Sequence, residues 1–394
     1  MPGPLDGVRI IDLTTMVAGP YATMLLGDQG ADVIKIERPV RGDQMRLYGE
    51  GSGGLTAPFL NNNRNKRSVV VDLKSPQGVE VVKRLAADAD VVVQNFRPGV
   101  VEKLGIDETA LRKVRSDLIY VSVSGFGEVG PLAKKPAYDP IIQAVSGLAS
   151  LQGGADEARP RMIRALVPDK ITALTVAQGV TAALYARAMT GEGQHLRLSM
   201  LEVVLSFLWA HEMDGHTFVG QQQDGPEGLS PYDMIYETAD GYICVATVTD
   251  DQFCRFAKAA DRTEWLEDPR FSTSDARERH RDVRLELMQQ VIKTAPTGEW
   301  LEKLEAADVP CGPVLTRREV VGHDHLRANG SLVEYDHAHA GPIRQARHPV
   351  RFDSTPADAL GHPPLLGEHT FEVLREAGFG DDELESLKDR GTIA

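Results

Sequence analysis

The 394-residue sequence predicts an α/β protein: a large domain built on a parallel sheet, and a second, smaller α+β domain. Short apolar runs alternate with helical stretches through the first half, and such strand–helix–strand units make neighbouring strands parallel. From about residue 225 the composition changes to polar, charge-rich segments. The length allows two domains, and 42% hydrophobic residues allow a sizeable core.

Six apolar runs are the predicted strands of the large domain. They cover residues 8–13, 31–37, 69–72, 89–94, 118–123 and 195–200. Helices are expected at 21–28, at 76–87 after the Ser75-Pro76 start signal, near 107–115, between Pro168 and Gly191, and up to Trp209. The turn after the first strand lacks Gly-x-Gly-x-x-Gly, which argues against a nicotinamide-dependent dehydrogenase.

The helix between Pro168 and Gly191 carries the leading catalytic candidate, Asp169. Its apolar residues recur at helical spacing, at Ile171, Leu174, Ala177, Val180, Leu184 and Ala188. Asp169 stands near the predicted helix start, where an aspartate commonly caps free backbone N–H groups. The alternative is a carboxylate nucleophile, which at an ordinary pKa of ~3.9 is ionised at neutral pH and needs no adjacent base.

Cations, amides and glycines cluster beside the predicted strands. Arg38 and Arg46 follow the second strand, the segment 61–67 precedes the third, 95–99 with Lys103 follows the fourth, and 124–127 follows the fifth. Ligands of parallel sheets bind beyond the carboxyl ends of the strands, and guanidinium and backbone N–H groups bind phosphate oxygens. A phosphorylated ligand and a set of solvated basic loops both fit this pattern.

Three segments are predicted: a large domain over residues 1–224, a small domain over 225–320, and a return to the large domain over 321–394. Strands at 232–238 and 242–249 flank an Asp240-Gly241 turn, followed by helices at 275–292 and 299–304. The polar, glycine-bearing stretch Gly220–Gly228 is expected to be a lid. A stiff link at 309–314, a strand-like patch at 363–367 and a helix near 368–377 complete the chain.

Several classes of function are disfavoured. A net charge of −14 argues against nucleic-acid binding. Three scattered cysteines suit neither a disulfide framework nor a zinc site, and Cys311 is interpreted as a structural thiol. Four histidines, His323, His325, His337 and His339, are interpreted as ordinary loop residues, so no metal is expected. Neither a membrane span nor a signal peptide is recognisable, so a cytoplasmic protein is expected.

Motifs spread along nearly the whole chain resemble those of the family III CoA-transferases. They include Asp12-Leu13-Thr14, Ala18-Gly19-Pro20, residues 34–39 with Gly42-Asp43, 65–68, 71–74, 95–99, 124–127, Tyr138-Asp139, the Asp169 helix, 190–194, 268–271, 309–314 and 366–370. The resemblance implies a Rossmann-like large domain, a smaller domain and a homodimer of interlocked subunits. It also implies that Asp169 is the nucleophile.

The same resemblance implies that coenzyme A is a substrate, exchanged between an acyl-CoA donor and a carboxylic acid acceptor, with no tightly bound cofactor. The CoA contacts it implies are Val17, Ala18, Arg38, Val71, Asp72, Leu73, Lys74, Asn95, Phe96, Arg97, Lys103, Pro136, Ala137, Tyr138 and Asp139. The sparse glycines of Gly220–Gly228 differ from the glycine run of formyl-CoA transferase, which argues against a formyl/oxalate pair.

Two alternatives remain open. A 2-methylacyl-CoA racemase shares this scaffold, but it has a His-Asp pair where this chain has Tyr138-Asp139. A phenol, with an ordinary pKa of ~10, replaces an imidazole poorly as an acid–base group at neutral pH. A non-catalytic CoA-binding module would need the loops at the strand ends but not Asp169.

Overall fold

The computed structural model describes residues 3–154, 158–220, 234–357 and 361–394, which form two units. One unit comprises Met1–Thr217 with Gly330–Ala394, and the other Phe218–Asn329. The predicted domain boundary at 225 lies outside the described residues. The predicted return at 321 falls within α15 (Arg317–Gly322), which groups with the second unit.

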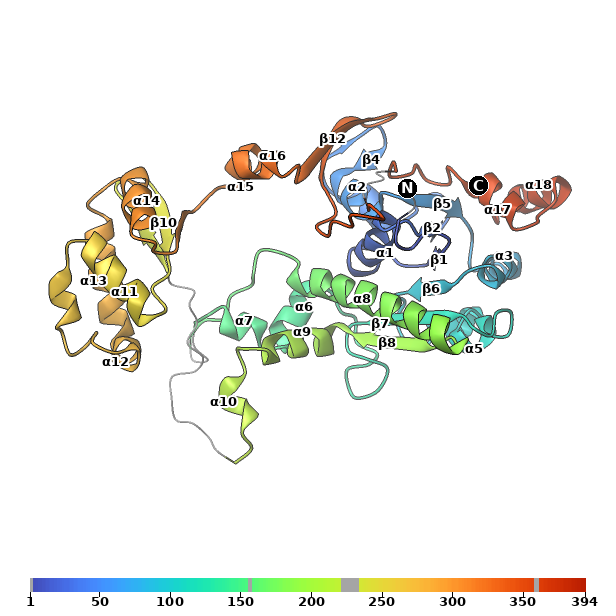
Figure 1. Cartoon of the computed structure of the whole chain (residues 1–394). Coiled ribbons are helices and arrows are strands. Elements are labelled where there is room, and N and C mark those ends of the chain that lie inside the picture. The colour runs from blue at the N-terminus through green and yellow to red at the C-terminus, as the bar shows by residue number, and fades with distance from the viewer. Residues whose placement is uncertain (1–2, 155–157, 221–233, 358–360) are drawn as a thin grey trace. The chain divides into compact units, whose positions relative to one another are not determined.

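A six-stranded parallel sheet forms the centre of the first unit (Figure 1). Its strands are β1 (Arg9–Asp12), β2 (Asp32–Glu37), β5 (Lys66–Val70), β6 (Val91–Gln94), β7 (Ile119–Ser124) and β8 (His195–Ser199). Every neighbouring pair is parallel, in the order β5-β2-β1-β6-β7-β8. The predicted α/β class is confirmed, and five of the six predicted strands agree with these bounds to within two residues. The third was placed too late: it was predicted at 69–72, but β5 begins at Lys66.

Two separate hydrophobic cores cover the two faces of the sheet. Alternate side chains of each strand pack into one core or the other, because successive residues of a strand point in opposite directions. Ile10 packs with α1 (Ala18–Asp28) and α8 (Val167–Thr190), whereas Ile11 packs with helices of the opposite face. Those helices are α3 (Pro76–Ala87), α5 (Glu108–Leu111), α17 (Thr370–Glu376) and α18 (Asp381–Asp389). The small side chains of α8, such as Ala173 and Ala177, lie buried against the sheet.

The strand order reverses between β1 and β6. In chain order the strands run third, second, first, fourth, fifth, sixth, so the connections leave these two neighbouring strands toward opposite edges of the sheet. A crevice forms at such a reversal, beyond the carboxyl ends of the two strands, and it is where α/β proteins bind ligands. The fold therefore predicts a ligand site between the loops that follow Asp12 and Gln94.

Shorter elements connect the strands and long helices of this unit. They are the 3-10 helix η1 (Gln44–Leu47), β3 (Gly51–Ser52), β4 (Leu55–Thr56), α2 (Ala57–Asn63), α4 (Val100–Leu104), α6 (Asp139–Val145), α7 (Leu148–Leu151), α9 (Met200–Trp209) and α10 (Asp214–Thr217). Ile142 of α6 and Val204 of α9 share a core with residues of α7 and α8. This core fixes the start of α8 relative to the sheet.

The second unit has its own core and a small antiparallel sheet, ordered β11-β10-β9. Its elements are β9 (Ile235–Glu237), β10 (Tyr242–Val245), α11 (Asp250–Ala259), η3 (Thr263–Leu266), α12 (Ser274–Arg279), α13 (Arg281–Ile292), α14 (Thr297–Ala306), β11 (Cys311–Pro313), α15 and α16 (Asp324–Ala328). The predicted link at 309–314 contains a strand, β11, which pairs with β10.

The C-terminal segment differs most from its prediction. An antiparallel pair, β12 (Leu332–His337) and β13 (Gly341–Ala346), was not anticipated, and the patch at 363–367 is not a strand. The predicted helix near 368–377 is α17. Of the predicted lid, Gly220–Gly228, all but Gly220 lies outside the described residues. Among the described helices, none combines the length and the apolar character that crossing a membrane requires.

Candidate active site

A cavity of ≈ 290 Å³ opens at the strand-order reversal of the first unit. It is lined from four directions: the loop after β1, the loop after β6, the loop after β7, and the start of α8. It is lined by the predicted nucleophile and six of the implied CoA contacts: Asp169, Ala18, Asn95, Phe96, Arg97, Ala137 and Tyr138. Residues far apart in the chain are thus gathered where the fold predicts a ligand site.

A second cavity, of ≈ 360 Å³, adjoins the first. It is lined by Arg38, Val71, Asp72, Leu73, Lys74 and, again, Phe96. Three residues, Thr15, Gln44 and Phe96, line both cavities and mark the passage between them. Together the cavities make one elongated site that runs from the end of β2 to the start of α8.

Four residues of the implied CoA contacts line neither cavity. Val17 is buried at the start of α1, and Asp139 is buried at the start of α6. Lys103 is exposed on α4, whose Val100 and Leu104 line the second cavity. Pro136 precedes Ala137. Their roles toward a ligand remain predictions.

A reciprocal pair of hydrogen bonds joins the two loops at the reversal. The Thr15 N–H donates to Oδ1 of Asn95 at 3.0 Å, and Nδ2 of Asn95 donates to the Thr15 carbonyl at 2.8 Å. One asparagine side chain therefore holds the loop after β1 to the loop after β6. Its amide is suited to this because it carries both a donor and an acceptor.

Asp169 is the third residue of α8, which begins after Leu166. No side chain caps this helix start, and the Asp169 carboxylate forms no hydrogen bond or ion pair with another described residue. Its side chain lies instead at the wall of the first cavity, half-buried. The capping role that explains most aspartates near helix starts does not explain this one.

Burial, and after it the nearby charge of Asp139, raise the pKa of Asp169 to about 7. Both causes disfavour the charged form, since a half-buried carboxylate loses water and a like charge repels it. The expectation of an ordinary pKa for Asp169 is therefore wrong. A strongly perturbed carboxyl group in a cavity is typical of a functional site.

The buried carboxylate of Asp139 connects three segments around the first cavity. Its Oδ2 accepts the Asp169 backbone N–H at 3.1 Å, and its Oδ1 accepts Nε2 of Gln143 at 2.7 Å. Gln143 in turn accepts the Ile163 N–H at 2.9 Å through Oε1. Asp139 thus holds the chain before α8 and the first turn of α8 against α6.

Gly125, after β7, allows an unusually close approach of two cavity walls. A Cβ atom at this position would lie 2.2 Å from the Cβ of Ala137. Any side chain at position 125 would push the segment containing Tyr138 away. Glycine is therefore required here by contact and not by backbone conformation.

Several cations that the sequence suggested for phosphate binding are neutralised by other residues. Arg46 pairs with Glu37 at 2.7 Å, Arg64 with Asp28 at 2.7 Å, Lys66 with Asp12 at 3.0 Å, and Arg67 with Asp32 at 2.6 Å. The segment 61–67 runs from the end of α2 into the first two residues of β5, so its cations lie at the amino end of that strand. The prediction that they bind phosphate beyond a carboxyl strand end is therefore wrong.

Other cations at the two cavities are exposed, and the described residues offer them no ion pair. Arg38 and Lys74 line the second cavity, and Arg97 and Lys135 line the first. Within the described part of the chain, the Arg38 side chain makes one hydrogen bond, from Nε to the Gly42 carbonyl at 3.0 Å. These four side chains are free to bind an anionic ligand.

Residues that sequence reasoning missed include Thr15, Gln44 and Lys135. Thr15 directly follows the Asp12-Leu13-Thr14 motif, and Gln44 directly follows Gly42-Asp43. Their position next to these motifs could have identified them as candidates. Among the described residues, no group of three or more His, Cys, Asp or Glu side chains could hold a metal ion. His337 is not a loop residue but lies buried in β12, with Nε2 2.9 Å from the Pro363 carbonyl.

The chain is similar to known proteins over most of its length. Residues 5–370 match CoA-transferase family III. The human succinyl-CoA:glutarate CoA-transferase is 33% identical over 385 residues, which cover 96% of this chain and 87% of the relative. The Agrobacterium fabrum succinate–glutarate CoA-transferase is 35% identical over 390 residues, covering 95% of both chains.

Two further similarities extend over the full length. A formyl-CoA:oxalate CoA-transferase of Escherichia coli is 32% identical over 419 aligned positions, covering 100% of both chains. Among solved structures, a CAIB/BAIF family protein from Brucella suis superimposes with a TM-score of 0.83 at 30% identity, covering 96% of this chain and 100% of that chain.

Proposed function

The chain belongs to CoA-transferase family III, and from this premise we propose that it moves CoA between two carboxylic acids through covalent intermediates on Asp169. One observation carries the proposal. The Asp169 carboxylate, half-buried at the cavity wall, serves no other described residue as a hydrogen-bond or ion-pair partner. A carboxylate that costs free energy to bury and stabilises no neighbour is explained by chemistry on a ligand.

The proposed reaction begins when a carboxylate oxygen of Asp169 attacks the thioester carbonyl of the donor. The carbon–sulfur bond breaks, which leaves a mixed anhydride on Asp169 and free CoA thiolate. The thiolate then attacks the Asp169 carbonyl carbon, releasing the donor acid and forming an aspartyl-CoA thioester. Each step exchanges one acyl bond for another, so the energy of the thioester is kept without ATP.

The second half of the reaction reverses the first with another acid. The acceptor carboxylate attacks the aspartyl thioester, giving a new anhydride and CoA thiolate. The thiolate attacks the acceptor carbonyl carbon of that anhydride, which releases the new acyl-CoA and restores the Asp169 carboxylate. Water must be kept from both intermediates, because either would hydrolyse.

The two adjoining cavities support a path for CoA. The phosphates are proposed to lie near Arg38 and Lys74 in the second cavity, since both side chains are exposed there. The pantetheine arm would then pass Phe96 and reach Asp169 in the first cavity. This arrangement places the reacting sulfur at the only carboxylate among the described residues that line the first cavity.

A dicarboxylic acid is the acceptor class that we favour. Arg97 and Lys135 line the same cavity as Asp169 and have no ion-pair partner among the described residues. They could bind the second carboxylate of an acid whose first carboxylate reacts. Similar proteins named for succinate and glutarate agree with this choice.

A homodimer is proposed because α8 and α9 carry large apolar side chains that are exposed in the single chain. Tyr185 and Met189 of α8 are 71% and 70% exposed, and Phe207 of α9 is 50% exposed. Large exposed apolar side chains commonly mark an interface between subunits.

Mass spectrometry of the wild-type protein incubated with succinyl-CoA and glutarate tests the proposal. Glutaryl-CoA should form, and a CoA adduct reducible by borohydride should map to the peptide containing Asp169. Acetate in place of glutarate should be a poor acceptor. An adduct at Cys311, or glutaryl-CoA formation that persists in Asp169→Asn, would contradict the mechanism.

A further inference from the structure

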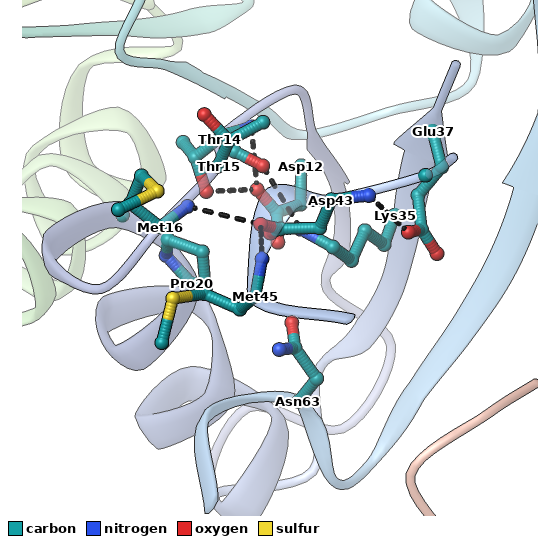
Figure 2. A network of polar contacts seen from close by, with 12 residues as sticks. Asp12, Thr14, Thr15, Met16, Pro20, Lys35, Glu37, Asp43, Met45 and Asn63 are labelled. Carbon is teal, nitrogen blue, oxygen red and sulfur yellow. Dashed lines mark hydrogen bonds and ion pairs between the residues drawn. The ribbon is translucent and has the colours of Figure 1, made fainter. Parts of the chain in front are cut away.

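Figure 2 shows a network of buried charged residues, of which Lys35 and Asp43 also line the second cavity. Lys35 pairs with Asp43 at 2.9 Å, and Lys66 pairs with Asp12 at 3.0 Å. All four side chains are fully buried, so two positive and two negative charges balance within the fold. The proposed chemistry uses none of them, and burying four charges is costly.

The pair of Lys66 and Asp12 lies at the end of β1. Although burial opposes its ionisation, the ammonium groups of Lys66 and Lys35 hold the pKa of Asp12 well below its usual range. The Asp12 carboxylate accepts the Thr14 N–H at 2.9 Å. Lys35 donates from Nζ to the Thr14 carbonyl at 2.9 Å. Both backbone groups of Thr14 are therefore bonded to the network.

Asp43 connects the network to two loops at once (Figure 2). While Oδ2 faces Lys35, Oδ1 accepts the N–H of Met16 at 3.2 Å and the N–H of Met45 at 3.0 Å. The bond to Met45 caps η1, which begins at Gln44. The bond to Met16 holds the loop after β1, so one carboxylate oxygen ties this loop to η1.

The backbone at Met16 needs such a constraint. Its φ is +71°, in the left-handed region that residues other than glycine rarely adopt. A conformation of this kind persists only where surrounding contacts enforce it, and it is common at functional sites. The hydrogen bond from Met16 to Asp43 is one of those contacts.

The two residues next to these bonds, Thr15 and Gln44, line both cavities. We propose that Asp43 is a positioning residue for CoA transfer: its Oδ1 holds Thr15 and Gln44 at the passage through which the thioester must reach Asp169. The part of this inference that concerns CoA transfer rests on the proposed function. The loop geometry does not, because it is a property of the protein without ligand.

Two matched double variants distinguish the effect of the Asp43 charge from the effect of its hydrogen-bond acceptor oxygen. Lys35→Met combined with Asp43→Asn removes both charges but keeps an oxygen that can accept the Met16 N–H. Lys35→Met combined with Asp43→Ala removes the charges and the oxygen. Neither variant leaves a buried charge unpaired, so both avoid the main cause of misfolding.

We expect the Ala variant to have a kcat at least about tenfold below that of the Asn variant, because a displacement near 1 Å is enough to slow a positioned reaction strongly. The Kd for CoA should differ less than about threefold between them, since the phosphate contacts are retained. Hydrogen–deuterium exchange of the peptide containing Met16, in the free protein, should be faster in the Ala variant.

Asp28→Ala is the control. It breaks the buried pair with Arg64, which lines neither cavity, and should lower Tm without lowering kcat. Equal kcat in the two double variants, or equal exchange at Met16, would overturn the inference. A wild-type protein without transfer activity would instead refute the proposed function, while the exchange measurement would still decide the role of Asp43.

Discussion

The backbone N–H of Asp169 donates a hydrogen bond to Oδ2 of Asp139, 3.1 Å away, so one carboxylate holds the helix turn that carries the other. The same proximity has an electrostatic effect. Burial and, next, the charge of Asp139 raise the pKa of Asp169 to about 7. At neutral pH, therefore, only about half of the protein carries Asp169 in the charged form that can attack a thioester.

The rate of transfer should depend on pH through Asp169. Because only the carboxylate attacks, kcat/KM should rise about tenfold per pH unit below 7 and level off above it. A pH profile from 5 to 9 measures this. Asp139→Asn removes the like charge and should move the inflection to lower pH; an inflection that stays in place would show that Asp139 does not perturb the nucleophile.

Asp169→Asn should abolish transfer and stabilise the fold. A pKa raised from 3.8 to about 7 gives a stability that is complete below pH 3.8 and is lost as the pH rises through 7. The neutral amide avoids this loss, so Tm of the variant should exceed that of the wild type at pH 8, by more than at pH 5. A lower Tm at both values would point to a structural role for the carboxylate.

Arg38→Ala and Arg46→Ala should have opposite consequences. Arg38 is exposed at the second cavity, so its loss should weaken CoA binding about tenfold with little change in Tm. Arg46 is buried against Glu37, so its loss should lower Tm by several degrees. Calorimetric titration with CoA and thermal unfolding separate the two; a stable fold with unchanged CoA affinity in Arg38→Ala would contradict its assignment.

The protein should not exchange the α-proton of a 2-methylacyl-CoA. Tyr138, 56% exposed at the cavity, stands where the racemase branch has a histidine, and a phenol is a weak base at neutral pH. Incubation in deuterium oxide followed by mass spectrometry detects exchange. Rapid incorporation at Cα that is lost in Asp169→Ala would favour the racemase.

The folded chains should remain dimeric on dilution. An interlocked dimer cannot separate without unfolding, so light scattering should show one species with twice the chain mass down to nanomolar concentration. Tyr185→Glu places a charge on the exposed apolar surface of α8 and should reduce the yield of dimer. A stable folded monomer of the wild type would count against the proposed assembly.

The sequence by itself determined the elements of the sheet and the place of the leading candidate. Apolar runs such as 89–94 become strands because a strand covered on both faces needs apolar side chains throughout. The helix of Asp169, α8, has Pro168 in its first turn and Gly191 just after its last residue, because these residues favour helix starts and stops. By contrast, β12 and β13 escaped prediction, since their polar side chains alternate with few large apolar ones.

Only the tertiary structure decided which charged side chains line the candidate site and which form ion pairs within the fold. Arg38 and Arg46 both follow the second predicted strand, and the sequence does not distinguish their roles. In the structure Arg46 forms an ion pair with Glu37, whereas Arg38 is exposed at the second cavity. The pKa of Asp169 depends on Asp139, thirty positions earlier in the chain, and on burial that no local pattern encodes. Electrostatic effects act through space over a few ångströms, so they follow from the folded arrangement and not from the order of residues.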